Sequence, residues 1–169
     1  MTHLKNLEDL FIHELRDLYN AEQQLITALP KMANAATSDD LKSAFNAHED
    51  QTRIHATRLE NIFSQLETKK SGKECKAMRG LIQEGQEIMN IGGETAVKDA
   101  ALIAAAQRIE HYEMAGYGTV RTYAKELGYN DAANLLQQTL NEEGNANQKL
   151  TNLAQGGLLE TGINEKATV

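Results

Sequence analysis

Tryptophan is absent from this sequence, and proline and cysteine each occur once. The single cysteine, Cys75, cannot form a disulfide within the chain, and a cysteine-rich zinc site is excluded. A chain without a disulfide framework is typical of a reducing compartment, so we expect a cytoplasmic protein. The longest fully apolar run, residues 100–106, is too short to cross a bilayer, and the first residues lack the apolar stretch of a secretory signal.

Positive charge is also scarce. The chain has 17 lysines and arginines against 24 aspartates and glutamates, which gives a net charge of −7. This balance argues against nucleic acid or an anionic membrane as a partner and favours the binding of cations. Only three phenylalanines are present, whereas leucine, alanine, glutamate and glutamine are abundant, so the composition predicts an all-α protein. With 169 residues, the chain is long enough for one domain whose core needs no crosslinks.

Apolar residues recur at steps of three and four along almost the whole sequence, which is the period of an α-helix. Four long helices are predicted, at about 4–36, 38–67, 95–127 and 131–155. Pro30 predicts a kink or a break in the first of them. Residues 37–40 can cap the second helix, and Gly128 fits the position just past the end of the third.

The lengths of the connections predict the topology. Short loops make helices one and two an antiparallel pair, and likewise helices three and four. The crossover 68–94, with its own short helix at about 74–90, is long enough to return along the bundle. The prediction is therefore a ferritin-like, up-down-down-up four-helix bundle over residues 1–156, followed by a flexible C-terminal tail at 157–169.

The informative polar residues are those that fall on the apolar faces of these helices, near their middles. They are Glu22 in the first helix, His48 and His55 in the second, Glu110 and Glu113 in the third, and Glu143 in the fourth. Glu142, by contrast, lies nearly a quarter-turn from its apolar face. Buried carboxylates repel one another unless cations neutralise them, and no lysine or arginine lies on these faces near the middle. Two divalent metal ions would balance the four carboxylates.

The pattern departs from the usual dimetal bundle, in which two of the helices carry Glu-x-x-His. Ala146 stands where such a histidine would follow Glu143, so the second helix has to supply the imidazole and, with it, Gln51. His48 and His55 are seven residues apart, roughly 10 Å along a helix. We therefore expect only one of them to reach a metal pair, with His55 the less favoured ligand.

Each of these residues also has an ordinary interpretation. Glu22 can reach solvent from the edge of the apolar face, a histidine on such a face is often a satisfied core residue, and Tyr117 can either pack in the core or hydrogen-bond a ligand carboxylate. Cys75 follows a basic stretch that could lower its pKa, but we expect an unremarkable surface cysteine. The coincidence of acids across four helices favours the metal site.

At this level of detail the sequence resembles the bacterial YciE/YciF family of ferritin-like, stress-associated proteins, and it is more similar to the YciF branch. The similarity covers about residues 4–154 and is carried by residues 11–25, 99–113, 115–118, 126–129 and 149–154. The resemblance implies a dimeric ferritin-like bundle with a di-iron or dimanganese centre, and some relatives look like manganese catalases.

The resemblance also implies site residues. Glu22, Glu110, Glu113 and Glu143 match the central acids of the family, and His48 matches its helix-two histidine. The sequence departs from the family where Gln51 replaces an acid, where Gly144 replaces a lysine, and where Asn147 often corresponds to an aspartate. The two amides, Gln51 and Asn147, remove negative charge near the expected centre.

Three functions are compatible with this sequence. The leading hypothesis is a dimetal-carboxylate protein with two manganese or iron ions that acts on peroxide or dioxygen, with Glu110 and Glu143 as central, catalytic ligands and Glu22 and Glu113 as terminal ones. The alternative is a non-catalytic, homodimeric stress protein or interaction module with a degenerate metal site, which the amides at 51 and 147 favour. Iron storage is a third hypothesis, and it needs a hollow shell.

Overall fold

The structure is a computed structural model that describes residues 4–157 and 160–168. Within these ranges the chain forms six helices and no β-strand; Gly156 and Thr161 make an isolated bridge. The helices are α1 (Leu7–Ala35), α2 (Asp39–Gln65), α3 (Lys76–Met89), α4 (Thr95–Glu126), α5 (Asn130–Gln155) and α6 (Ile163–Lys166).

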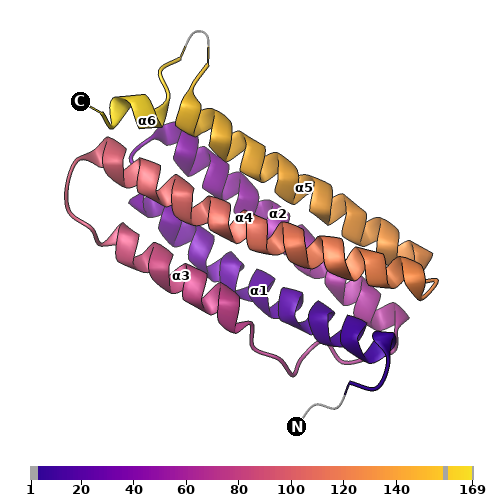
Figure 1. Cartoon of the computed structure of the whole chain (residues 1–169). Helices are drawn as coiled ribbons and strands as arrows, with labels where there is room; N and C mark the ends of the chain where they lie inside the picture. Colours follow the sequence, from indigo (N-terminus) through magenta and orange to yellow (C-terminus); the bar gives the residue numbers. More distant parts are fainter. Residues whose placement is uncertain (1–3, 158–159, 169) are drawn as a thin grey trace.

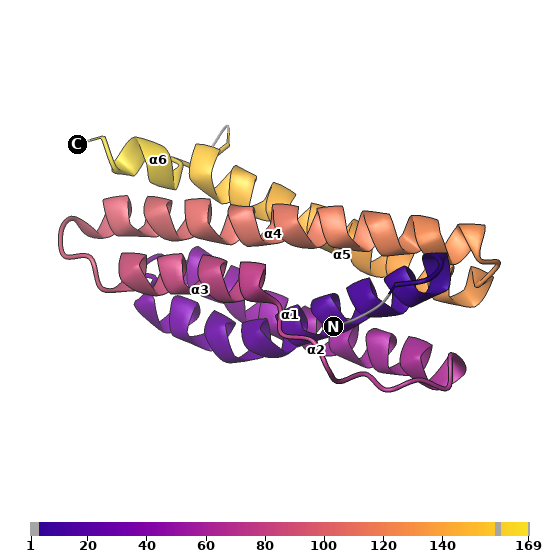
Figure 2. The same ribbon diagram turned by 60° about the horizontal axis from the view of Figure 1, so that its bottom comes forward.

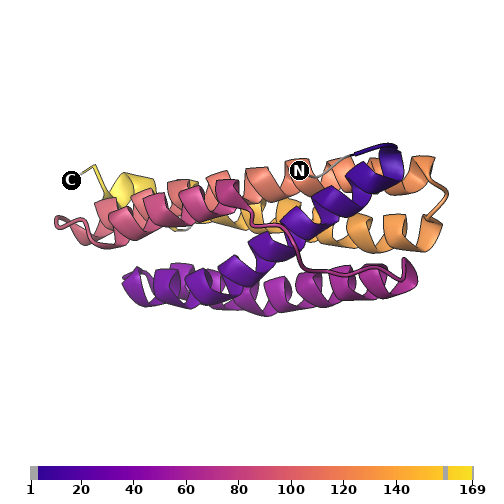
Figure 3. The ribbon, with the colours of Figure 1, turned by 90° about the horizontal axis from the view of Figure 1, so that it is seen from below.

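The four long helices lie side by side as two antiparallel pairs, α1 with α2 and α4 with α5 (Figure 1). In the sequence, α3 follows the first pair and precedes the second. It runs back along the bundle, so that α4 starts at the same end as α2. Figures 2 and 3 show α3 alongside α4 at the side of the bundle, and it packs against both α1 and α4. The predicted all-α bundle with one long crossover is confirmed.

The tight turn between α1 and α2 is fixed by a residue from a third helix. The carboxylate of Asp99 in α4 accepts hydrogen bonds from the backbone N–H groups of Thr37 and Ser38, at 2.8 and 2.7 Å, and from the Thr37 hydroxyl at 2.6 Å. Asp99 is buried, and Ser38 in turn caps α2 by accepting from the N–H of Leu41. This contact joins the two helical pairs at one end of the bundle.

Buried apolar side chains form two clusters that occupy opposite halves of the bundle. On every long helix, the polar residues singled out in the sequence lie between a residue of one apolar cluster and a residue of the other. These polar residues, all buried, are Glu22 in α1, His48 and His55 in α2, Glu110 and Glu113 in α4, and Glu143 in α5. The core is therefore interrupted by one polar layer to which all four long helices contribute.

The structure narrows one local expectation and corrects another. Of the kink or break predicted at Pro30, the break is absent, because the packing of the apolar face on both sides of the proline outweighs the loss of one backbone hydrogen bond. The tail is also not uniformly flexible. Although residues 158, 159 and 169 lie outside the described residues, Ile163–Lys166 forms α6, and the buried Ile163 joins the apolar cluster nearest to it.

Candidate metal centre

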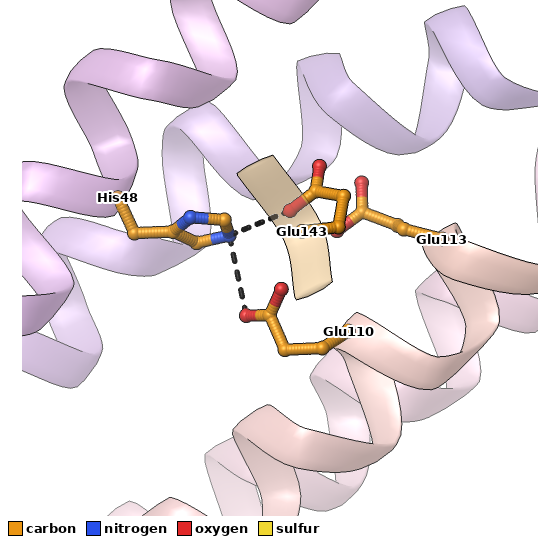
Figure 4. A group of neighbouring side chains, drawn as sticks. All are labelled: His48, Glu110, Glu113 and Glu143. Atoms are coloured by element: carbon orange, nitrogen blue, oxygen red, sulfur yellow. Dashed lines mark ion pairs between the residues drawn. The ribbon is translucent and has the colours of Figure 1, made fainter. Parts of the chain in front are cut away.

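One group of ligand atoms is formed by four side chains from three helices. His48 comes from α2, Glu110 and Glu113 from adjacent turns of α4, and Glu143 from α5 (Figure 4). Nε2 of His48 lies 3.2 Å from Oε1 of Glu110 and 3.8 Å from Oε2 of Glu143. One ligand atom from each residue lies within 4.8 Å of the others, so a single cation can contact all four.

A second group adjoins the first and consists of Glu22, His55 and Glu143. Nδ1 of His55 lies 2.9 Å from Oε1 of Glu143 and 3.7 Å from Oε1 of Glu22. Glu143 thus belongs to both groups, with one carboxylate oxygen facing His48 and the other facing His55. A carboxylate in this arrangement can bridge two cations.

Both imidazoles lie close to the acids of the cluster, although the helix rise separates the two backbone positions by roughly 10 Å. The rings themselves are closer, because their centroids are only 6.5 Å apart. The expectation that only one of them binds metal, with His55 the less favoured ligand, stays a prediction.

A shell of further residues holds the second group. Tyr117 packs in the core and donates a hydrogen bond from its hydroxyl to Oε1 of Glu22, so it does both of the things that the sequence left open. On the other side, Nε2 of His55 donates to Glu142 at 2.8 Å. Arg58 holds the same carboxylate with two hydrogen bonds, at 2.5 and 2.9 Å.

Burial and mutual repulsion shift the pKa values of the acids. Burial, followed by the charge of Glu143, raises the pKa of both Glu110 and Glu113 well above the usual value. Burial raises the pKa of Glu22 to about 8, against the opposing charge of His55. Burial would also raise the pKa of Glu143, but the close contact with Nδ1 of His55 and the charge of that ring lower it. Glu143 is therefore the carboxylate that carries the negative charge.

The pKa values of the two imidazoles shift in opposite directions. Burial lowers the pKa of His48, so this ring is neutral and can offer a lone pair. Burial acts in the same direction on His55, but the close contact with Glu143 and the negative charge of that carboxylate outweigh it and raise the pKa to about 9. Without a cation, His55 and Glu143 thus form a buried ion pair among neutral acids.

The residues fit a pair of divalent cations. In the part of the chain that the structure describes, nine buried side-chain atoms of the cluster have no hydrogen-bond partner: Oε2 of Glu22, both nitrogens of His48, Nδ1 of His55, Oε2 of Glu110, and both oxygens of Glu113 and of Glu143. Unpaired buried polar atoms are costly, and together they supply four carboxylates and two imidazoles. Two divalent ions would neutralise the four carboxylates and use these lone pairs.

The two amides that distinguish the sequence occupy different surroundings. Gln51 is half-buried and lines a small cavity together with His48 and Glu110. Asn147 accepts a hydrogen bond from the Gln107 amide at 3.2 Å, and that amide also donates to Thr151. Asn147 therefore belongs to a neutral polar contact between α4 and α5, next to the cluster along the helix.

The expectation of a surface cysteine is wrong. Cys75 is buried, and its sulfur lies 3.0 Å from the hydroxyl of Tyr112, which donates to Asp17. Lys73 pairs with Asp17 at 3.1 Å. Burial, followed by the contact with Asp17, raises the pKa of the Cys75 thiol rather than lowering it. The basic stretch does not determine this pKa because burial has the larger effect.

Fold and site together define a class: an all-α bundle with carboxylates and imidazoles from all four long helices gathered in its core. The model of the family described as "Domain of unknown function (DUF892)" matches residues 6–167, and the chain belongs to this family. The chain is also 47% identical over 152 residues to Protein YciF of Escherichia coli K12. The aligned residues make up 89% of this chain and 92% of that protein. The similarity to the YciF branch is confirmed.

Solved structures agree with this assignment. The crystal structure of the E. coli stress protein YciF matches with a TM-score of 0.86 and 46% identity, covering 89% of this chain and 95% of that one. YcfI from Rhodopseudomonas palustris matches with a TM-score of 0.85 and 45% identity, covering 89% and 96%. A protein from Xanthomonas campestris, 16% identical with a TM-score of 0.68, shares the fold, over 86% and 89% of the two chains. Among the described helices, none combines the length and the apolar character needed to span a membrane.

Proposed function

We propose that this protein is a dimetal-carboxylate protein of the stress response that binds two manganese or iron ions and acts on peroxide or dioxygen. The observation that carries the proposal is the position of Glu143, whose two carboxylate oxygens face two different imidazoles. Hard carboxylate oxygens with two imidazoles suit manganese and iron. The name of the E. coli relative as a stress protein supports the biological setting.

In this proposal the side chains have distinct roles. Glu143 would be shared by the two ions, His48, Glu110 and Glu113 would hold one of them, and Glu22 with His55 would hold the other. When bound, two manganese or iron ions would supply the two-electron redox change that cleavage of a peroxide needs.

Glu110 lies at the cavity that adjoins the cluster, so of the proposed carboxylate ligands it is the one that an incoming oxidant meets first. Tyr117 holds Glu22 in place from the opposite side, through its hydroxyl.

The test is elemental analysis of untagged protein purified without chelator, together with the consumption of peroxide by the same sample. We expect about two manganese or iron ions per chain. Glu110→Ala should lose bound metal and keep its helicity, whereas the control Glu126→Ala, an exposed acid of the same helix, should keep both. No bound metal after loading with manganese or iron, or unchanged metal in Glu110→Ala, would overturn the proposal.

A second function remains as the alternative, namely a non-catalytic, homodimeric interaction module. The neutral surroundings of Asn147 and the raised pKa values of Glu110 and Glu113 favour it, because a cluster of protonated acids can persist without metal. A protein without bound metal but with the mass of a dimer in light scattering would support this alternative, and a shell of many copies would support iron storage.

A further inference from the structure

A small cavity of about 40 Å³ lies between α2 and α5, beside the metal cluster. His48 and Glu110, both buried, line its inner part. Ala47 and Lys149, which also line the cavity, are exposed, and Ala146 is half-buried. The cavity thus extends from solvent-exposed residues to two members of the cluster.

The other sides of the cluster are closed by protein. Glu22, His55 and Glu143 have exposed fractions of 0%, and Glu113 has 1%. His48, at 6%, is the most exposed of the six cluster residues, Glu110 follows at 2%, and these are the two that line the cavity. Both nitrogens of His48 are without a hydrogen-bond partner, so the inner end of the cavity presents unsatisfied polar atoms.

We infer that this cavity is the entry route for a small oxidant, hydrogen peroxide or dioxygen, and that Ala47 and Ala146 set its size limit. This inference rests on the proposed function and specifies its substrate class. On the same measure of volume one water molecule needs about 10–15 Å³, so the cavity has room for a molecule of two or three heavy atoms and little room for the carbon groups of an organic hydroperoxide. Phe45 and Leu150 form apolar walls, so the polar atoms at the inner end orient the molecule.

The size limit follows from the short side chains on both helices. A methyl group at 47 and at 146 leaves the space between α2 and α5 open at the level of His48. A leucine at either position would add three carbons to a cavity of only about 40 Å³. Because Ala47 is exposed, a larger side chain there does not disturb the core.

Azide, a linear anion of three atoms, is the probe. Protein loaded with manganese or iron is mixed with azide, and its binding is followed by absorption in wild type, Ala146→Leu, Ala47→Leu and the control Ala104→Leu, an exposed alanine on α4. We expect binding at least about tenfold slower in the two cavity variants, with unchanged metal content and an unchanged rate in the control. We also expect the wild type to consume hydrogen peroxide but not tert-butyl hydroperoxide.

The two proposals fail in different ways. A wild type without bound metal would overturn the proposed function and, with it, the entry route. Metal-loaded variants that bind azide as fast as wild type would overturn the entry route and leave the metal centre standing. If Ala146→Leu loses metal because it perturbs the half-buried helix contact, Ala47→Leu still decides the question.

Discussion

Glu142 accepts a hydrogen bond from Nε2 of His55, at 2.8 Å, on the side of the ring opposite the nitrogen that contacts Glu143. A proton on Nε2 leaves the lone pair of Nδ1 directed at Glu143 when the ring is neutral. Arg58 holds Glu142 with two hydrogen bonds, so the orientation of the ring is set from α5 and α2 together. This is the arrangement in which a carboxylate fixes the tautomer of a metal-binding histidine.

The first prediction concerns this pair. Glu142→Ala and Arg58→Ala should weaken metal binding by about 10- to 100-fold, although neither residue is a ligand, because the ring of His55 loses its support. Glu142→Gln, which keeps an acceptor oxygen, should retain more affinity than Glu142→Ala. Titration with manganese monitored by calorimetry measures the effect, and Arg53→Ala, whose arginine pairs with Glu49 on the surface of α2, is the control. Equal affinities in all four variants would contradict the positioning role.

The second prediction concerns the pH dependence of the metal-free protein. His55 titrates near 6.5 in an unfolded chain and at about 9 in the fold, where Glu142 and Glu143 face it, so its contribution to stability is complete below pH 6.5 and is lost as the pH rises through 9. Glu22 has a usual pKa of 4.5 and a folded value of about 8 beside Tyr117, so its contribution also declines as the pH rises from 4.5 through 8.

Both groups therefore act in the same direction, and the melting temperature of chelator-treated protein should fall between pH 6.5 and 9. Metal-loaded protein should show the opposite trend, because protons compete with metal for the same ligands. Thermal unfolding followed by circular dichroism at several pH values measures both curves. A metal-free curve that rises over this range would contradict the assignment, and Glu22→Gln should have a shallower slope than wild type.

A third prediction concerns the contact between Asp99 of α4 and the turn that joins α1 to α2. Asp99→Ala should lower the free energy of unfolding by about 1–3 kcal/mol, because two backbone N–H groups and a hydroxyl lose a shared buried acceptor. Glu94→Ala, at an exposed position that makes no side-chain cap to α4, should have little effect. Urea unfolding measures the difference. Metal stoichiometry should be the same in both variants, since Asp99 is not a member of either ligand group.

The fourth prediction concerns Cys75. Its burial and its contact with Tyr112 predict that the thiol reacts with a thiol reagent in denaturant but only slowly in the native protein. An absorbance assay with a disulfide reagent measures both rates. Rapid reaction of the native protein would show that the segment around Cys75 opens readily.

The helical period was sufficient to find the bundle and most of the polar layer. Acids such as Glu110 and Glu113 are visible in the sequence because they interrupt an otherwise apolar face. Their proximity to Glu22 and Glu143 followed from the predicted packing, because each of these residues lies near the middle of its helix and the helices run side by side. Which of these residues bind metal stays a prediction.

Other features depend on contacts between helices that no single period reveals. The helical period does not identify Glu142 as a residue of the polar layer, because Glu142 lies off the apolar face of α5. Its long side chain nevertheless hydrogen-bonds to His55 and Arg58 of the neighbouring α2. Asp99 gave no signal either, because its partners are backbone groups of a distant turn. The pattern of charges around Cys75 pointed to the surface, whereas packing decided its burial.

The crossover has a consequence for the order of events in folding. Neither ligand group is complete within one helical pair: one draws on α2, α4 and α5, and the other on α1, α2 and α5. Each pair can form from contacts that are close in the sequence, but the cluster requires docking of segments separated by the whole crossover. If the cluster binds metal as proposed, ions that recognise only the docked pairs would bind after the pairs have docked. They would then slow unfolding and lengthen the lifetime of the native state rather than hasten its formation.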